Sequence, residues 1–341
     1  MTSSAATYIH LLLQAASDQS ASDIHFYPHE KKEKVNIFFR IHGMRKFIRT
    51  IRLNVYETLV TYLKFTAGLD IGEKRLPQSG TLPFTTKDHR HFSLRISTLP
   101  LTTVESMTIR LLEQTNLLSL DELFLFRFQY EQIKTLTKKT TGLIIFSGPT
   151  GSGKTTTMYA LLEAMKQRSQ LQAITLEDPI EKQISDVIQV EINERAGITY
   201  ATGLKAVLRH DPDVILLGEI RDEMTAQYAV RAALTGHLVI STLHAKDAYG
   251  TIDRLRDLGI QPIDLQQTLI AIVAMQLLPF QRKGKITRRA AIVEILDEQK
   301  IQSSFMERQR MESPHDTFEQ LRVKAYAYGF ITKETFAQFH H

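Results

Sequence analysis

The residues best suited to chemistry form a glycine-rich run, GPTGSGKTTT, from Gly148 to Thr157. An apolar run, LIIF, precedes it, and a helix-like stretch, MYALLEAMK, follows it. A strand, a glycine loop and a helix that begins with Lys-Thr match the pattern G-x-x-x-x-G-K-T, which is typical of a phosphate-binding loop. The glycines leave room for backbone N–H groups to surround a phosphate, and the helix N-terminus adds partial positive charge.

Two side chains of this loop have definite expected tasks. Lys154 can reach β- and γ-phosphate oxygens, and the Thr155 hydroxyl can bind Mg²⁺. A plain glycine-rich turn is the alternative, but the complete motif and its strand–helix context speak against it. We therefore expect a nucleotide to be bound by consecutive residues, Gly148, Pro149, Thr150, Gly151, Ser152, Gly153, Lys154, Thr155 and Thr156.

An acidic residue that could activate water ends the apolar run VILLGE. This residue, Glu219, should project at the carboxyl edge of a parallel sheet, beside the glycine loop. It is our candidate for the base that orients water on the γ-phosphate. Asp222 follows closely, and it either supports Glu219 or caps the next helix.

A second acidic cluster lies in LEDPIE, where Glu177 and Asp178 end a neighbouring apolar run and Glu181 follows Pro179. Acids at this place can hold Mg²⁺ through water or position the nucleophile. A turn rich in helix caps is the structural alternative. The expected Mg²⁺ ligands, some of them acting through water, are Thr155, Glu177 and Glu219.

Histidine and arginine residues could complete such a site. His244 follows the apolar run LVISTL, where a side chain could sense a γ-phosphate, whereas His237 fits a structural role equally well. Charge that develops on the γ-phosphate also calls for arginine. Two strand-like runs near the N-terminus carry Arg95 and Arg110, and the further candidates are Arg75 and Arg40.

Composition narrows the class of protein. The chain has 341 residues, of which 43% are hydrophobic and 23% charged, as in soluble globular proteins of about two domains. No apolar run approaches a membrane span, and we expect no signal peptide. With no cysteine, disulfides and cysteine-based zinc sites are excluded. The net charge of +5 comes from the N-terminal third, as a basic patch or as ordinary solvated surface.

Hydrophobic periodicity predicts two domains. Residues 1–113 predict a small α+β domain with an antiparallel sheet, and residues 114–119 a linker. Residues 120–341 alternate short apolar runs with helical stretches, which predicts an α/β domain with a parallel sheet covered on both faces. From about residue 260 we expect a helical subdomain that includes IDLQQTLIAIVAMQLL, with QRKGKITRR as a basic loop or turn.

Four ordered motifs resemble those of the secretion ATPases, which power type II secretion, type IV pili and DNA-uptake pseudopili. GPTGSGKTTT is similar to the Walker A motif of that family, LEDPIE to its Asp box, DPDVILLGEIRD to its Walker B motif and TGHLVISTLHAKDA to its His box. The runs SDIHFYP, FFRIHG, RLPQSG, LRISTLP and MTIRLL resemble its second N-terminal domain. The resemblance therefore covers nearly the whole chain.

The resemblance implies an ATP hydrolase that uses ATP and Mg²⁺ and has a RecA-like P-loop domain behind a PAS-like N-terminal domain. It implies a homohexamer in which Arg95 and Arg110 complete the nucleotide site. In the same way Glu219 matches the catalytic glutamate, Glu177 the Asp-box acid and His244 the His-box residue. The ring would be cytoplasmic, peripheral to the cytoplasmic membrane, and would act on a polytopic platform protein and indirectly on pilins.

The chain departs from the family pattern at His42, where Asp is usual, and at Ser79 and Thr81, which replace Asp and Arg of LPQDGR. These changes affect expected N-domain contacts and leave the phosphate-facing motifs intact. The larger extension ATPases commonly carry a tetracysteine zinc motif, but this chain has no cysteine, so we expect no zinc. The RLPQ loop is generally lacking in retraction ATPases. The chain therefore most resembles the competence-pilus assembly ATPase of Gram-positive bacteria.

Three other functions stay open at this point. A pilus retraction ATPase is the second choice. A nucleic-acid motor of the RecA type would fit the basic N-terminal third, although the Asp and His boxes are not helicase features, and we expect no direct nucleic-acid partner. A non-catalytic scaffold is disfavoured because Lys154, Glu177 and Glu219 are all present.

Overall fold

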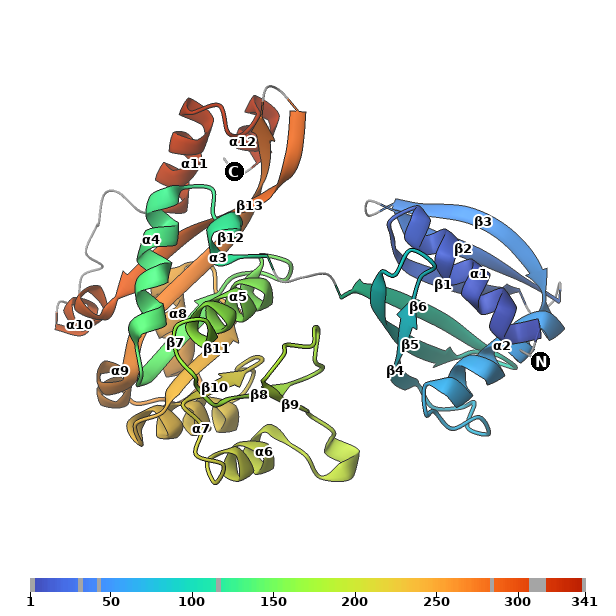
Figure 1. The fold of residues 1–341 in the computed structure, drawn as a ribbon, viewed down its shortest axis with the longest axis horizontal. Helices are drawn as coiled ribbons and strands as arrows, with labels where there is room; N and C mark the ends of the chain where they lie inside the picture. Colours follow the sequence, from blue (N-terminus) through green and yellow to red (C-terminus); the bar gives the residue numbers. More distant parts are fainter. Residues whose placement is uncertain are drawn as a thin grey trace. The chain divides into compact units, whose positions relative to one another are not determined.

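The chain forms two compact units, residues 1–116 and residues 117–341 (Figure 1). The boundary falls inside the linker predicted at residues 114–119. Each unit is described by itself below. The computed structural model describes residues 4–29, 33–41, 44–114, 118–282, 285–306 and 317–338.

The N-terminal unit is an antiparallel sheet with helices on one face. In its described residues the sheet has six strands in the order β3-β2-β1-β6-β5-β4. The strands are β1 (Ala21–His29), β2 (Lys34–Ile41), β3 (Met44–Arg52), β4 (Gln78–Thr85), β5 (His91–Pro100) and β6 (Glu105–Glu113). The helices that cover it are α1 (Ser4–Asp18) and α2 (Leu53–Thr66) (Figure 1).

Alternating side chains explain why this sheet has one covered and one open face. Ile24 and Phe26 of β1 are buried among residues of α1 and α2, whereas their strand neighbour His25 lies on the other face. An apolar–polar alternation of this kind is typical of an antiparallel sheet with one wet side. A buried ion pair joins Lys64 Nζ of α2 to Glu105 Oε2 of β6 at 2.6 Å. The core of this unit thus includes a charged contact that fixes α2 to the sheet.

The C-terminal unit is built around a larger sheet, mostly parallel. In its described residues this sheet has seven strands in the order β13-β12-β7-β11-β10-β8-β9. The strands are β7 (Gly142–Ser147), β8 (Ala173–Glu177), β9 (Ile188–Glu191), β10 (Val214–Leu217), β11 (Leu238–Leu243), β12 (Leu269–Arg282) and β13 (Lys285–Asp297). Only the pairing of β12 with β13 is antiparallel among the strand pairs described for this sheet.

Helices cover both faces of this sheet (Figure 1). One face packs against α6 (Tyr200–Val207), α7 (Glu223–Leu234), α8 (Ala248–Asp257) and α9 (Pro262–Thr268). The other face packs against α3 (Leu120–Leu123), α4 (Arg127–Thr135) and α5 (Lys154–Lys166). The helices near the C-terminus are α10 (Glu298–Met306), α11 (Phe318–Ala327) and α12 (Lys333–Gln338).

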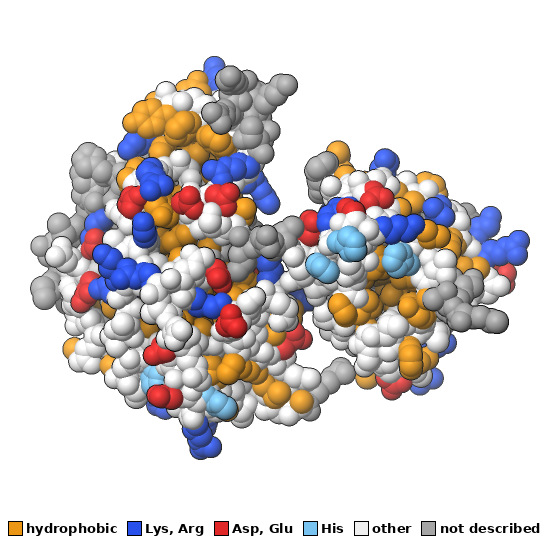
Figure 2. Space-filling model, viewed as in Figure 1, with side chains coloured by type: hydrophobic (Ala, Val, Ile, Leu, Met, Phe, Trp, Pro, Cys, Tyr) orange, Lys and Arg blue, Asp and Glu red, His pale blue; other side chains and the backbone are white. Residues whose placement is uncertain are grey.

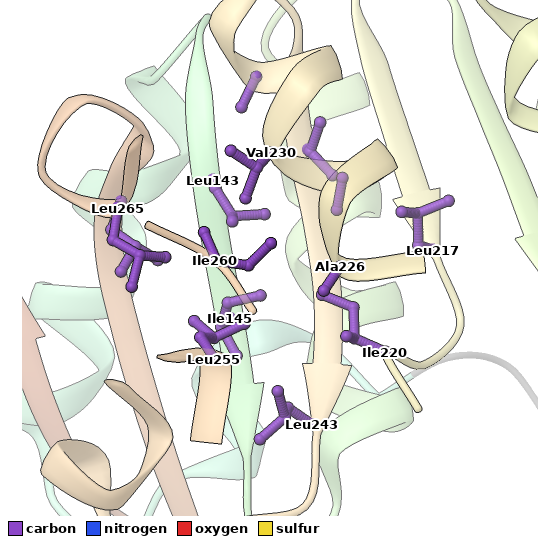
Figure 3. Packing of buried hydrophobic residues seen from close by; sticks show 14 of the residues in the cluster. Leu143, Ile145, Leu217, Ile220, Ala226, Val230, Leu243, Leu255, Ile260 and Leu265 are labelled. Atoms are coloured by element: carbon purple, nitrogen blue, oxygen red, sulfur yellow. The ribbon is translucent and has the colours of Figure 1, made fainter. Parts of the chain in front are cut away.

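Strand β7 shows why the central strands are apolar at every position. Leu143 and Ile145 point into one core, and Ile144 and Phe146 into the other, so no face of the strand meets water. Figure 3 shows Leu143 close to Val230 of α7. Burying one such side chain contributes about 1.5–3 kcal/mol. The expected α/β fold with a covered parallel sheet is confirmed.

The prediction of a mainly helical segment from about residue 260 is wrong for residues 269–297. Strands β12 and β13 form a long hairpin there, and β12 lies beside β7 in the sheet. Ile272 and Ala274 face one core, and Val273 and Met275 face the other. A strand buried on both faces has the same uninterrupted apolar run as a buried helix, so periodicity does not separate the two. Within QRKGKITRR, residues 283 and 284 are outside the described residues.

A smaller hydrophobic cluster attaches the C-terminal helices to this hairpin. It joins side chains of α11 to residues of β12 and β13, including Leu321, Leu278 and Ile292. Hydrophobic side chains are visible on the surface at this end of the unit (Figure 2), and Tyr326 and Tyr328 are exposed. None of the described helices is long and apolar enough to cross a membrane.

Candidate active site

Parallel pairing brings four strand ends to one edge of the C-terminal sheet. Leu217 of β10 pairs with Leu176 of β8 and with Ser241 of β11, and Leu243 of β11 pairs with Ser147 of β7. The residues that follow these ends therefore lie near one another. They are Gly148 after β7, Glu177 and Asp178 at the end of β8, Glu219 after β10 and His244 after β11.

The glycine loop has the backbone geometry that a phosphate cradle requires. Gly148, Gly151 and Gly153 have φ angles of 142°, 78° and 94°, a region that side chains disfavour. A Cβ atom on Gly148 would lie 2.6 Å from the Met275 carbonyl oxygen of β12, so the close approach of β12 also requires glycine.

Two further features of the loop fit an anion. Helix α5 begins at Lys154, and the residue before it, Gly153, supplies no side-chain cap to the first N–H groups. The hydroxyl of Ser152 is buried and has no hydrogen-bond partner within the described residues. Unsatisfied donors at a helix N-terminus attract phosphate. The residues present therefore fit the triphosphate of a nucleotide.

Lys154 is held inside its own loop. Its Nζ donates hydrogen bonds to the carbonyl oxygens of Gly148, at 2.7 Å, and Pro149, at 3.1 Å. Burial lowers the pKa of the Lys154 ammonium, while the negative charges of Glu219 and Glu181 act in the opposite direction. The cation is thus bound by the loop carbonyls and stabilised by the charge of two carboxylates, and it can exchange a carbonyl for a phosphate oxygen.

Glu219 is partly exposed and both of its carboxylate oxygens have partners. Arg221 Nε donates to Oε2 at 2.9 Å, and His244 Nε2 lies 3.1 Å from Oε1. The structure therefore brings the predicted base and the predicted γ-phosphate sensor into direct contact. Asp222 accepts a hydrogen bond from the Thr225 backbone N–H at 2.7 Å, so it caps α7. Capping was one of the two roles expected for it.

Glu177 has a very different environment, because its residue is only 2% exposed. One carboxylate oxygen accepts from the Tyr159 hydroxyl of α5. The other accepts from Thr175 Oγ1 at 2.6 Å and from Gln189 Nε2 of β9 at 3.2 Å. The carboxylate thus joins β8, β9 and the helix that follows the glycine loop. Its oxygens are directed at protein donors, whereas the sequence suggests a Mg²⁺ ligand.

The other acids of LEDPIE interact with charged or titratable groups of the site. Asp178 Oδ2 is 3.3 Å from Arg221 Nη1, and the charge of Glu181 acts on Lys154 and on Tyr159. Sequence reasoning gave these acids no separate role, because three carboxylates in one short motif give the same signal.

Two contributors to the site are missing from the sequence prediction altogether. Arg221 follows Glu219 by two residues and contacts both Glu219 and Asp178. The hydroxyl of Tyr200 is packed near Gly218, where a Cβ atom would lie 3.3 Å from it. Burial raises the pKa of Tyr200, and the charge of Asp178 raises it further. A basic residue next to the Walker B acid was the only available sequence signal for Arg221.

The candidate arginines of the N-terminal unit lie on the open face of its sheet. Arg95 of β5 pairs with Arg110 of β6. Arg110 Nε donates to Asp23 Oδ1 at 2.8 Å, and Arg40 Nε is 3.7 Å from Asp23 Oδ2. Burial raises the pKa of Asp23, but hydrogen bonds from Arg110 and Ser22 outweigh it and leave that pKa below its usual range. Arg95 and Arg110 are thus neighbours on adjacent strands.

Two of the three residues that depart from the family pattern lie in strand β4. Ser79 and Thr81 are regular residues of β4, and Thr81 pairs with Arg95. Arg75, a further candidate arginine, is exposed, and its backbone N–H donates to Glu73 Oε1 at 2.5 Å. His42 lies outside the described residues.

Comparisons with known proteins show the family of the chain. A family model described as "Type II/IV secretion system protein" matches residues 2–329. Competence protein ComGA of Bacillus subtilis is 41% identical over 341 residues, with 95% of each chain covered. Type II secretion system ATPase E of Vibrio cholerae is 41% identical over 270 residues, which cover 79% of this chain and 53% of that protein.

Solved structures share the fold. The pilus retraction motor PilT with bound ADP is 27% identical, with a TM-score of 0.77 over 97% of this chain and 96% of that one. The ATPase DotB of Legionella pneumophila, at 21% identity and a TM-score of 0.74, has the same fold over 97% of this chain and 95% of its own. With a family match over almost its whole length and a complete phosphate-binding loop, the chain belongs to the type II/IV secretion system protein family and is an ATPase.

Proposed function

We propose that this ATPase drives the assembly of a competence pilus that takes up DNA. The observation that carries this proposal is the 41% identity to ComGA of Bacillus subtilis across 95% of both chains. ComGA of Halalkalibacterium halodurans supports it, with 42% identity and the same coverage. The type II secretion relatives match only about half of their own length.

In the hydrolytic step, we assign the phosphate-facing roles to the glycine loop. Lys154 exchanges its loop carbonyls for phosphate oxygens, and the N–H groups at the start of α5 hold the phosphates. Mg²⁺, when bound with ATP, supplies charge neutralisation at the phosphates, and the hydroxyl of Thr155, in the first turn of α5, would bind it. Glu219 accepts the proton of the attacking water, and His244, in contact with it, orients its carboxylate.

We assign the acids of LEDPIE two different tasks. Glu181, whose charge acts on Lys154, helps to position Mg²⁺ and water. Glu177 keeps β8, β9 and α5 in register through its buried hydrogen bonds. This assignment modifies the expectation that Glu177 itself binds Mg²⁺.

The motor function requires partners that we propose from the family membership. The working form is a homohexamer in which Arg95 and Arg110 reach a nucleotide site and neutralise charge on the γ-phosphate. The ring works on the cytoplasmic side of the membrane against a polytopic platform protein, which acts in turn on pilins. Opening and closing of the site during ATP turnover is the source of movement, and no zinc is involved.

A chromosomal Lys154→Ala strain tests the proposal. We expect loss of pili and of transformation, because the lysine that binds phosphate is gone. Lys87→Ala, in an exposed turn of the N-terminal unit, is the matched control and should leave both unchanged. Normal numbers of pili together with normal DNA uptake in a Lys154→Ala strain that produces the protein would contradict the proposal.

Retraction is a second candidate because the pilus retraction motor PilT matches this chain over almost its full length with a TM-score of 0.77. The two functions give opposite phenotypes in a deletion strain. Loss of an assembly ATPase removes pili, whereas loss of a retraction ATPase leaves more and longer ones. Counting pili by electron microscopy therefore separates them directly.

A further inference from the structure

Both oxygens of the Glu219 carboxylate are occupied by cationic or hydrogen-bonding side chains. Oε2 accepts from Arg221 Nε at 2.9 Å, and Oε1 lies 3.1 Å from His244 Nε2. A carboxylate that takes a proton from water needs an oxygen that the water can reach. Each carboxylate oxygen has a second lone pair, but a guanidinium held at Oε2 competes with water for that oxygen. Release of one of these partners would therefore leave its oxygen entirely to the attacking water.

Arg221 is the partner that can leave without losing its ion pair. Its Nη1 already lies 3.3 Å from Asp178 Oδ2, at the end of the neighbouring strand β8. The side chains of Arg221 and Asp178 are 57% and 46% exposed, so neither is confined by packing. Half-exposed ion pairs of this kind are individually weak, and an exchange of acceptor is correspondingly easy.

The backbone on both sides of Arg221 is fixed, so its side chain is the movable element. The Ile220 N–H donates to the Thr242 carbonyl oxygen at 2.9 Å. Asp222 caps α7 through the Thr225 N–H at 2.7 Å. Movement between Glu219 and Asp178 therefore needs only rotation of the arginine side chain.

We propose that Arg221 is a latch on the catalytic glutamate. In the resting site it pairs with Glu219 Oε2, and during turnover it moves fully to Asp178 and leaves that oxygen to the attacking water. Arg221 acts through Glu219 and is a positioning residue. The inference rests on the role proposed for Glu219, and it gives Asp178 the task of receiving the arginine.

The latch predicts an unusual pattern of activities in the purified full-length protein, measured as kcat and KM for ATP with Mg²⁺. Asp178→Asn should lower kcat about three- to fivefold with little change in KM, because Arg221 then has only Glu219 to pair with. Arg221→Gln should keep kcat at or above that of the wild type. The double variant should turn over as fast as Arg221→Gln alone, which is faster than Asp178→Asn.

Two results would overturn the latch. If the double variant is as slow as Asp178→Asn or slower, Asp178 acts on the reaction by itself. If Arg221→Gln loses most of its kcat, or raises KM strongly, the arginine is needed for chemistry or for binding ATP. Asp178→Ser provides a second variant at that position, and circular dichroism melting checks that each variant is folded. The matched controls are Arg231→Gln and Asp257→Asn, which change exposed side chains away from this edge.

A Glu219→Gln variant separates failure of the latch from failure of the underlying assignment. If Glu219→Gln still hydrolyses ATP, both the proposed base and the latch fail. If Glu219→Gln is inactive but the double variant does not recover, only the latch fails. Because the assay measures ATP hydrolysis in vitro, its outcome is independent of the proposed role in pilus assembly.

Discussion

The ends of strands β8 and β10 carry the same residue type in two contrasting settings. Glu177 is the last residue of β8 and Glu219 follows β10, and these two buried apolar strands pair directly with each other. Glu177 is buried and accepts three hydrogen bonds from protein side chains, whereas Glu219 is partly exposed and contacts two side chains at the edge of the site. The contrast teaches that a carboxylate at a strand end becomes structural or chemical according to the side chains that neighbouring elements bring to it.

The largest effect expected from this contrast is on catalysis at Glu219. Glu219→Gln should lower kcat by about 10²- to 10⁴-fold, because the amide cannot take a proton from water. The melting temperature should barely change, since glutamine keeps the shape of the side chain. Steady-state ATPase assays with a parallel thermal melt measure both. A large loss of stability would place Glu219 in the same structural class as Glu177 and remove the contrast.

The next effect is on stability at Glu177. Glu177→Ala leaves the hydroxyls of Tyr159 and Thr175 and the amide of Gln189 without their acceptor. We expect the free energy of unfolding to fall by about 3 kcal/mol. Urea denaturation measures this, with Glu194→Ala at an exposed site as the control. If stability is unchanged and only the Mg²⁺ dependence of hydrolysis shifts, Glu177 is a metal ligand.

A smaller effect should distinguish the two ends of strand β11. His244→Ala removes one partner of Glu219 and should lower kcat about tenfold, the value of one charge-assisted hydrogen bond. His237 precedes the same strand and contacts Thr235 and the Ala232 carbonyl, away from that edge. His237→Ala should therefore leave kcat unchanged. Equal losses of kcat in the two variants would show that the packing of strand β11, rather than the contact with Glu219, explains the effect.

The smallest effect tests a single hydrogen bond to Glu177. Tyr159→Phe removes the hydroxyl and leaves Thr175 and Gln189 as donors. We expect a loss of about 1 kcal/mol in the free energy of unfolding and an unchanged kcat. Tyr130→Phe, at a half-buried tyrosine of α4, is the matched comparison. A strong fall in kcat at full stability would mean that Glu177 reaches the reaction through α5.

The sequence predicted the site where a motif fixes both backbone and chemistry. The glycine loop needs left-handed residues in a set order between a strand and a helix, so its position and geometry could be read directly. The position of Glu219 at a strand end also followed from its apolar run. The burial of Glu177 did not, because it depends on Tyr159 and Gln189, which arrive from α5 and β9.

The fold could be predicted where buried positions recur at regular intervals along the chain. It was ambiguous where every position is buried. Alternation along β1 and the spacing of α7 each identify their elements. Along β12 every residue from Ile272 to Met275 is buried, so strand and helix give the same pattern. The pairing of β12 with β7 settles the choice, and that partner lies more than a hundred residues earlier in the chain.

Because β12 is synthesised long after β7, the two units can complete their folding at different times during translation. All six described strands of the N-terminal sheet lie within residues 1–116, so that unit can close as soon as it has emerged. In the C-terminal unit β7 pairs with β11 on one side, but its other edge stays open until Leu269 and the residues after it are synthesised. A nascent chain that stalls before this point would expose the edge of the strand leading into the glycine loop, where another chain could pair with it.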